Sequence, residues 1–243
     1  MRFHTPAELR IPHIGILWNK FREDYPNIQH AQPISSTKGE LLFDIATGIP
    51  LPRVWFINKS DDQLIQFQFD RFYFNWRRRQ NDYPRYSEVI KNFKVIMHII
   101  QAMFKQLNLG ELKPVELELS YINHIPKGQG WETIDDLLMI FNDFQWKKSS
   151  TRLLSSPKKV SWDLEFDLPE QNGRMNVSLK QAVRLDDKTP LLVLELKTKG
   201  IIDTKDENVV FAWYDLAHSW IVQGFTDLTT KKIQKLWERE DNV

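Results

Sequence analysis

Residues Phe67–Arg79, with the sequence FQFDRFYFNWRRR, place six aromatic side chains and four arginines in thirteen residues. The apolar residues before Asp70 are odd-numbered (Ile65, Phe67, Phe69), and those after Arg71 are even-numbered (Phe72, Phe74, Trp76). Successive residues of a strand point to opposite faces, so the phase of the pattern changes at Asp70-Arg71. A two-residue hairpin favours Asn-Gly, whereas an extra residue in a strand makes a β-bulge. We predict one long strand, Leu64–Arg77, with a bulge at Asp70-Arg71, mainly buried aromatic side chains, and exposed Arg78 and Arg79.

The rest of the chain alternates between the two kinds of periodicity. Period-two runs predict strands at Val54–Asn58, Val115–Ile125, Val160–Leu168, Met175–Leu185 and Leu191–Thr198, and helical spacing predicts helices at 14–21, 88–107, 208–222 and 230–239. Thr133 begins a capping-box pattern and a further helix. Residues 27–50 are rich in Pro, Gly and Ser, which indicates a loop with a short strand at Leu41–Ile45.

This order predicts the α+β class: a curved antiparallel sheet of two strand meanders with long helices packed on one face. Both halves place a meander before a long helix, which suggests a duplicated unit. We expect a single α+β domain over residues 1–243. If the domain is subdivided, the predicted parts are 1–146 and 160–243, joined by the basic, serine-rich segment 147–159.

Composition limits the function classes. The 243 residues carry a formal net charge of +1 and no cysteine. No global field therefore attracts nucleic acid, and disulfides, thiolate metal sites and cysteine nucleophiles are excluded. The N-terminus lacks an apolar signal-peptide core, and charged residues interrupt the most apolar run, Val89–Leu107. We expect a cytoplasmic protein without a membrane segment.

Catalytic motifs are scarce. The six histidines form no HxH, HExxH or i,i+4 pair, and the nine glycines form no phosphate-binding or dinucleotide motif. This scarcity favours a non-enzymatic binding protein without a cofactor.

One enzymatic alternative stays open. Glu195-Leu196-Lys197 lies on an apolar strand and is preceded by several acids, among them Asp163, Asp167, Asp186 and Asp187. Two carboxylates and a lysine in this arrangement hold Mg²⁺ and orient water in one nuclease superfamily. The hypothesis requires Glu195 and Lys197 to lie within about one side-chain length of one of these acids. The same pattern also arises on any strand with a solvated face.

A second open alternative is nucleic acid. Arg77, Arg78, Arg79 and Arg85 alternate with Tyr83 and Tyr86, a combination that suits phosphate pairing and base stacking. The near-neutral net charge favours instead a solvated strand end whose arginines cover apolar neighbours.

The segments HIGILWNKFREDYP, LIQFQFDRFYFNWRRR…YPRY, ELSYINHI and WYDLAHSWIVQGFTDLTTKKIQKLWER cover much of the chain. In order and spacing the chain resembles a sporadically distributed prokaryotic family of about this length, which has no established function. Family members usually have a strand before the first helix and often end in Trp-Gly, where this chain has Trp237-Glu238. The resemblance implies one domain, prokaryotic origin and mobile operons of the toxin–antitoxin or phage-defence kind. Its motif positions are Arg71, Asn75, Trp76, Arg77, Tyr83, Pro84, Tyr121, Asn123, His124 and His218.

We therefore expect a binding protein whose partner is a protein encoded nearby or a second copy of the chain. The predicted ligand-binding residues are Arg71, Asn75, Arg77, Tyr121, Asn123 and His218. A buried arginine requires a carboxylate, a carbonyl or a ligand anion. If Arg71 and Arg77 pair with acids of this chain, they are structural and the binding site lies elsewhere.

Overall fold

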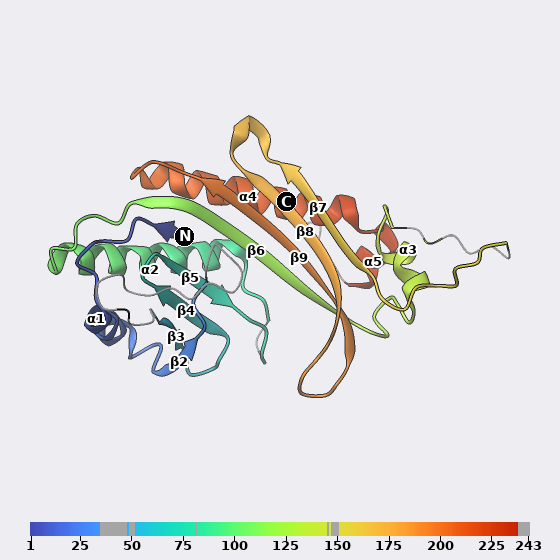
Figure 1. Cartoon of the computed structure of the whole chain (residues 1–243), viewed down its shortest axis with the longest axis horizontal. Helices are drawn as coiled ribbons and strands as arrows, with labels where there is room; N and C mark the ends of the chain where they lie inside the picture. The colour runs from blue at the N-terminus through green and yellow to red at the C-terminus, as the bar shows by residue number, and fades with distance from the viewer. Residues whose placement is uncertain (35–47, 49–51, 81, 145, 147–150, 238–243) are drawn as a thin grey trace. The chain divides into compact units, whose positions relative to one another are not determined.

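The structure of the protein is a computed structural model that describes residues 1–34, 48, 52–80, 82–144, 146 and 151–237 (Figure 1). The strands are β1 (Arg2–Phe3), β2 (Asn27–Ala31), β3 (Arg53–Ile57), β4 (Gln63–Gln68), β5 (Arg71–Trp76), β6 (Pro114–Pro126), β7 (Ser161–Asp167), β8 (Arg174–Val183) and β9 (Pro190–Ile201). The helices are α1 (Ile11–Phe21), α2 (Tyr86–Gln106), α3 (Leu137–Ile140), α4 (Glu207–Leu228) and α5 (Lys231–Leu236), with short 3₁₀ turns at Ile134–Asp136 and Pro169–Gln171.

The described strands form an antiparallel sheet in the order β2-β3-β4-β5-β1-β6-β9-β8-β7. This confirms the predicted α+β class and its two meanders. The predicted strand at Leu41–Ile45 lies outside the described residues, and the strand β2 was not predicted. None of the described helices combines the length and apolar character that a membrane crossing requires.

The chain divides into two compact units. The first comprises Met1–Glu116 and Ile202–Asp206, and the second comprises Leu117–Ile201 and Glu207–Val243. The boundary falls inside β6 rather than in the basic segment 147–159, of which residues 151–159 are described and lie in the second unit. Each unit holds one meander followed by one long helix, which is the repeated order that the sequence indicated.

In the first unit, the predicted bulge is wrong. Phe69 and Asp70 form a two-residue turn, and β4 and β5 pair antiparallel from Gln68↔Arg71 outward. Neither turn residue has a positive φ, so the turn does not need the Asn-Gly sequence that primed hairpins favour. The Asp70 carboxylate stabilises the turn because it accepts hydrogen bonds from Gln68 Nε2 and Arg71 Nε, both at 3.0 Å. The change of phase in the aromatic pattern therefore marks a hairpin.

The hairpin gives the first unit an aromatic core. Cross-strand pairing places Phe67 opposite Phe72, and both are fully buried, as is Phe3 of β1. The Phe3 ring centroid lies 5.7 Å from that of Phe104, and the Phe72 ring stacks on Phe93 at 5.3 Å, so α2 covers this face. Phe67, Phe69 and Phe72 are buried and Arg78 and Arg79 are exposed, as predicted, whereas Phe74 and Trp76 are only partly buried.

In the second unit, β7, β8 and β9 pair in continuous register, and α4 packs on β9. Leu192, Leu194 and Leu196 share the buried face of β9 with the inner residues of β8, while Glu195 and Lys197 lie on the opposite face. The capping box that begins at Thr133 is present, because the Asp136 side chain accepts from the Thr133 backbone N–H at 2.8 Å. The helix it precedes ends after one α-helical turn.

Candidate functional site

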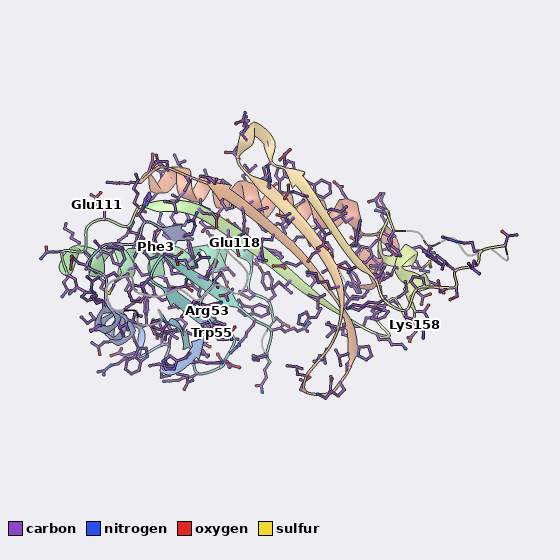
Figure 2. All side chains as sticks on the ribbon, viewed as in Figure 1. Phe3, Arg53, Trp55, Glu111, Glu118 and Lys158 are labelled. Atoms are coloured by element: carbon purple, nitrogen blue, oxygen red, sulfur yellow. The ribbon has the colours of Figure 1, made fainter. Side chains whose placement is uncertain are left out.

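A row of polar and aromatic side chains lies on the face of β2–β5 opposite the aromatic core. The strand register places Gln29, Trp55, Gln66 and Tyr73 in line across the four strands. Arg53 precedes Trp55 by two residues and therefore shares its face. We name Arg53, Trp55, Gln66, Tyr73 and Asn75 the Arg53 face; its residues are partly buried. Figure 2 labels Arg53 and Trp55 on this part of the sheet.

Hydrogen bonds connect three members of the Arg53 face. Arg53 Nη1 donates to Gln66 Oε1 at 3.2 Å, and Gln66 Nε2 donates to Asn75 Oδ1 at 2.7 Å. The guanidinium carbon of Arg53 lies 5.5 Å from the centroid of the Trp55 ring, within the range of a cation–π contact. The amide of Asn75, a residue predicted to line the site, thus helps to fix the orientation of Gln66 and, through it, of Arg53.

Two donors on this face have no acceptor among the described residues. Arg53 Nε and Trp55 Nε1 are both inaccessible to water and make no hydrogen bond. Leaving a buried donor unpaired destabilises the folded state by about 1–3 kcal/mol. Two such donors on neighbouring side chains of one face are rare in native structures and call for an explanation. The pKa of Arg53 lies below its ordinary value, mainly because of burial. The nearby Tyr73 raises this pKa, and the Arg71 cation lowers it further. The described residues thus provide no acceptor for Arg53 Nε or Trp55 Nε1.

Arg71 has the partner that Arg53 lacks. Its Nε and Nη2 donate to the two carboxylate oxygens of Asp70, at 3.0 and 2.7 Å, and its side chain is only 8% exposed. Burial works against the charge of Arg71, but the Asp70 carboxylate outweighs it and raises the pKa of Arg71 above its ordinary value. Because Arg71 pairs with an acid of this chain, the condition stated in the sequence analysis makes it a structural residue.

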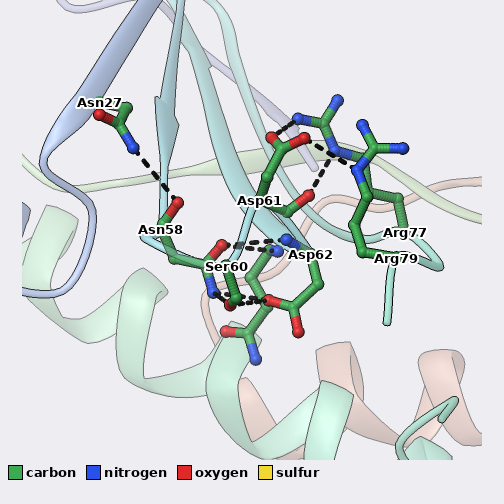
Figure 3. Close-up of polar contacts among 8 residues, drawn as sticks. Asn27, Asn58, Ser60, Asp61, Asp62, Arg77 and Arg79 are labelled. Carbon is green, nitrogen blue, oxygen red and sulfur yellow. Dashed lines mark hydrogen bonds and ion pairs between the residues drawn. The ribbon is translucent and has the colours of Figure 1, made fainter. Parts of the chain in front are cut away.

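Arg77 also pairs with an acid. Its Nη2 contacts the Asp61 carboxylate and its Nε donates to the Asp61 carbonyl at 2.8 Å, while Arg79 Nε donates to the same carboxylate at 2.8 Å (Figure 3). Asp61 sits in the β3–β4 turn with φ 59°, beside the hydrogen-bonded side chains of Asn58 and Asp62. The two arginines hold this turn against the end of β5. The binding hypothesis therefore moves from Arg71 and Arg77 to Arg53.

In the second unit, three of the predicted site residues come together. The Tyr121 hydroxyl and His218 Nδ1 form a hydrogen bond of 2.9 Å. Tyr121 and Asn123 also line a cavity of about 180 Å³, whose other walls are Leu196, Ile221, Val222 and Phe225. Burial lowers the pKa of His218, and the nearby Asp215 acts against it. Because the walls are mostly apolar and Tyr121 and His218 bond each other, the cavity presents few groups that could orient a polar ligand.

The nuclease residues do not converge. Glu195 Oε1 accepts from Lys197 Nζ at 2.7 Å and from Ser120 Oγ at 2.9 Å. Burial opposes the ionisation of Glu195, but these two donors outweigh it and lower its pKa. Asp163 and Glu195 both lie opposite Ser178 of β8, so their strands are two spacings, about 10 Å, apart.

The remaining candidate acids have other positions. Asp167 pairs with Arg174, Asp187 pairs with Arg184, and Asp186 lies in the same β8–β9 turn as Asp187. No group of three His, Cys, Asp or Glu side chains suited to a metal ion occurs within the part of the chain that the structure describes. None of these four described acids is therefore placed beside the Glu195–Lys197 pair.

The sequence did not single out Arg53 and Trp55. The available signal was the Arg-x-Trp spacing in PRVWFI, which places a cation and an indole on one face of a strand. A search with models of known protein families and a search of curated proteins both found no match for the chain. The assignment of a function therefore depends on the geometry of the site.

Proposed function

We propose that this protein is a non-enzymatic binding protein and that the Arg53 face receives an acceptor-bearing group from a partner protein. The observation that carries the proposal is the pair of buried, unpaired donors, Arg53 Nε and Trp55 Nε1. A partner oxygen placed between them removes the cost of two unpaired donors and gains a charge-assisted hydrogen bond. The resemblance to a patchily distributed prokaryotic family supports a cytoplasmic partner encoded nearby, in an operon of the toxin–antitoxin or phage-defence kind.

A protein partner fits the charges better than a nucleic acid. Binding to a phosphate backbone requires several uncompensated cations. Arg71, Arg77 and Arg79 are each compensated by a carboxylate, which leaves Arg53 as the cation of this face without a described acidic partner. The net charge of +1 adds no attraction at long range.

The experiment is affinity purification of the tagged protein from its own organism, with chemical cross-linking and mass spectrometry. Wild type is compared with Arg53→Gln and Trp55→Phe, and Arg174→Gln is the matched control because Arg174 is an ion-paired arginine on a strand of the second unit. We expect one recurring protein that cross-links to β2–β5, is lost in both test variants and is retained in the control.

Two results would refute this function. One is a partner that Arg53→Gln and Trp55→Phe retain at the wild-type level. The other is a chain that is monomeric by light scattering and recovers no recurring partner. A homo-oligomer that depends on Arg53 would instead show that the partner is a second copy of the chain.

A further inference from the structure

Among the described strands, β2 is an edge of the sheet. It is the last of the described strands on its side, pairs only with β3 in the strand order, and keeps an unbroken register from Asn27↔Ile57 to Ala31↔Arg53. Residues 27–30 are exposed. Natural edge strands are commonly protected by Lys, Pro, inward charges or a bulge, because their unpaired backbone groups can bind another strand. The sequence NIQHA contains none of these devices.

The Arg53 face lies directly beside this edge. Ala31 of β2 is the cross-strand neighbour of Arg53, and Gln29 is the neighbour of Trp55. Ala31 has only a methyl group, so its side chain does not cover Arg53. The chain then continues to Ile34, whose backbone N–H and C=O bond the Gln68 side chain of β4 at 2.8 and 3.0 Å on the same face. A strand added to β2 would place a residue opposite Ala31, about 10 Å from the backbone of Arg53. An acidic side chain there and the long side chain of Arg53 can meet above Ala31.

We infer that β2 binds an extended segment of the partner protein as an additional strand, and that this segment carries a carboxylate opposite Ala31 that accepts hydrogen bonds from Arg53 and Trp55. The inference rests on the proposed function and specifies its partner. Backbone pairing along β2 provides affinity, and the acid provides specificity, as in other cases of strand addition. Nε of Arg53 is inaccessible to water although the residue as a whole is partly exposed, so the inference requires a rotation about the outer side-chain torsions that brings Nε toward the edge.

The opposite face of β2 provides a second contact. Ile28 is 47% exposed and lies on the core side of the sheet, where its cross-strand neighbour Phe56 is fully buried. An apolar side chain of the added strand can cover Ile28 there. The predicted segment therefore has an acid on one face and an apolar residue on the other, and such a segment differs chemically from a polyanionic nucleic acid strand.

The probe for this inference is the N-acetylated, C-amidated nonapeptide KVTVEVTVK, which carries its central Glu on one strand face and valines on the other. It is titrated into the ¹⁵N-labelled full chain and followed by amide NMR. The controls are the same peptide with its central Glu replaced by Gln, the peptide N-methylated at alternate residues, and oligo(dT). We expect the Glu peptide to shift the amides of Asn27–Ala31 and Arg53. The Gln peptide should bind about tenfold or more weakly, because a charge-assisted hydrogen bond is lost, and the N-methylated peptide should not bind.

The variant Arg53→Lys keeps the positive charge but removes Nε. It should weaken binding of the Glu peptide and leave binding of the Gln peptide unchanged, whereas Arg174→Lys should change the binding of neither peptide. Equal binding of the Glu and Gln peptides, no shift at β2, or shifts caused by oligo(dT) instead would each overturn strand addition with an acid. Such a result leaves the proposed function standing if the cellular partner still depends on Arg53. Loss of that dependence refutes the proposed function itself.

Discussion

Replacing Arg53 and Arg71 in turn by methionine tests whether their roles differ as the geometry indicates. Both changes remove one positive charge from the same sheet face and keep a long apolar side chain. Arg71→Met leaves the Asp70 carboxylate, whose side chain is 26% exposed, without its bidentate partner. Removal of one member of a buried pair costs 3–5 kcal/mol, and with the partial exposure of Asp70 we expect a loss of about 2–4 kcal/mol.

Arg53→Met has opposing effects. It removes the hydrogen bond to Gln66, worth about 1 kcal/mol, and the cation–π contact with Trp55, worth about 0.5–1 kcal/mol. It also removes the buried, unpaired Nε, a relief of about 1–3 kcal/mol. The free energy of unfolding should therefore stay within about 1 kcal/mol of wild type.

The assay is thermal and urea unfolding followed by far-UV circular dichroism and tryptophan fluorescence. For a chain of this size 1 kcal/mol corresponds to roughly 2–4 °C in Tm, so a loss of about 2–4 kcal/mol in Arg71→Met should lower Tm by roughly 4–16 °C. Partner binding should show the reverse order, with a larger loss for Arg53→Met among folded molecules. If Arg53→Met lowers Tm as much as Arg71→Met, Arg53 is structural and the reasoning fails.

Three further changes test other parts of the structure. Burial raises the pKa of Tyr25 from 10.0 to about 12, so folding favours its protonated form. The resulting contribution to the free energy of unfolding is complete below pH 10 and is lost between pH 10 and 12. Over this range the wild type should lose about 1–2 kcal/mol after solvent screening, and Tyr25→Phe should lose none of it. Gly173→Ala should cost about 3 kcal/mol or more in urea unfolding, because φ is +123° and the new Cβ would lie 1.9 Å from the Lys199 carbonyl oxygen, and a mild effect would contradict this turn geometry. Burial lowers the pKa of His218 below 6.5, so folding favours the neutral imidazole. Its contribution to the free energy of unfolding is complete above pH 6.5 and is lost as the pH falls through the pKa in the folded state. The free energy of unfolding should therefore fall less steeply with decreasing pH in His218→Gln, and an unchanged pH dependence would refute the assignment.

The local patterns of the sequence determined most secondary structure. The helical spacing of α2 and α4 and the alternation of β7–β9 depend on neighbours within a few residues, and these elements form as predicted. The strand β2 was missed because NIQHA has little apolar alternation: it is an edge strand with residues 27–30 exposed. The family resemblance stays a prediction.

Only the tertiary structure decided the choice between a bulge and a hairpin at Asp70-Arg71. A bulge and a hairpin both produce the same change of phase in the apolar pattern. The sequence favoured the bulge because the Asn-Gly pair of a common two-residue hairpin is missing here. The Phe69–Asp70 turn instead uses negative φ and a side-chain clamp by Asp70, whose carbonyl also accepts from the Phe3 backbone N–H at 2.7 Å. That last contact crosses 67 residues and leaves no local sequence signal.

Tertiary structure also decided which arginine is available for binding. The sequence predicted that a buried arginine needs an acid, and the fold decides which acid it is. The hairpin turn orients the adjacent Asp70 onto Arg71, and the β3–β4 turn brings Asp61, 16 residues away, to Arg77. Tyr121 and His218 likewise meet across 97 residues. The described partners of Arg53 are Gln66 and Trp55, neither of which is acidic. Strand register, a long-range property, places Gln66 there. The sequence alone thus determined the kinds of side chain on this sheet, while pairing between distant segments decided which of them lack a partner.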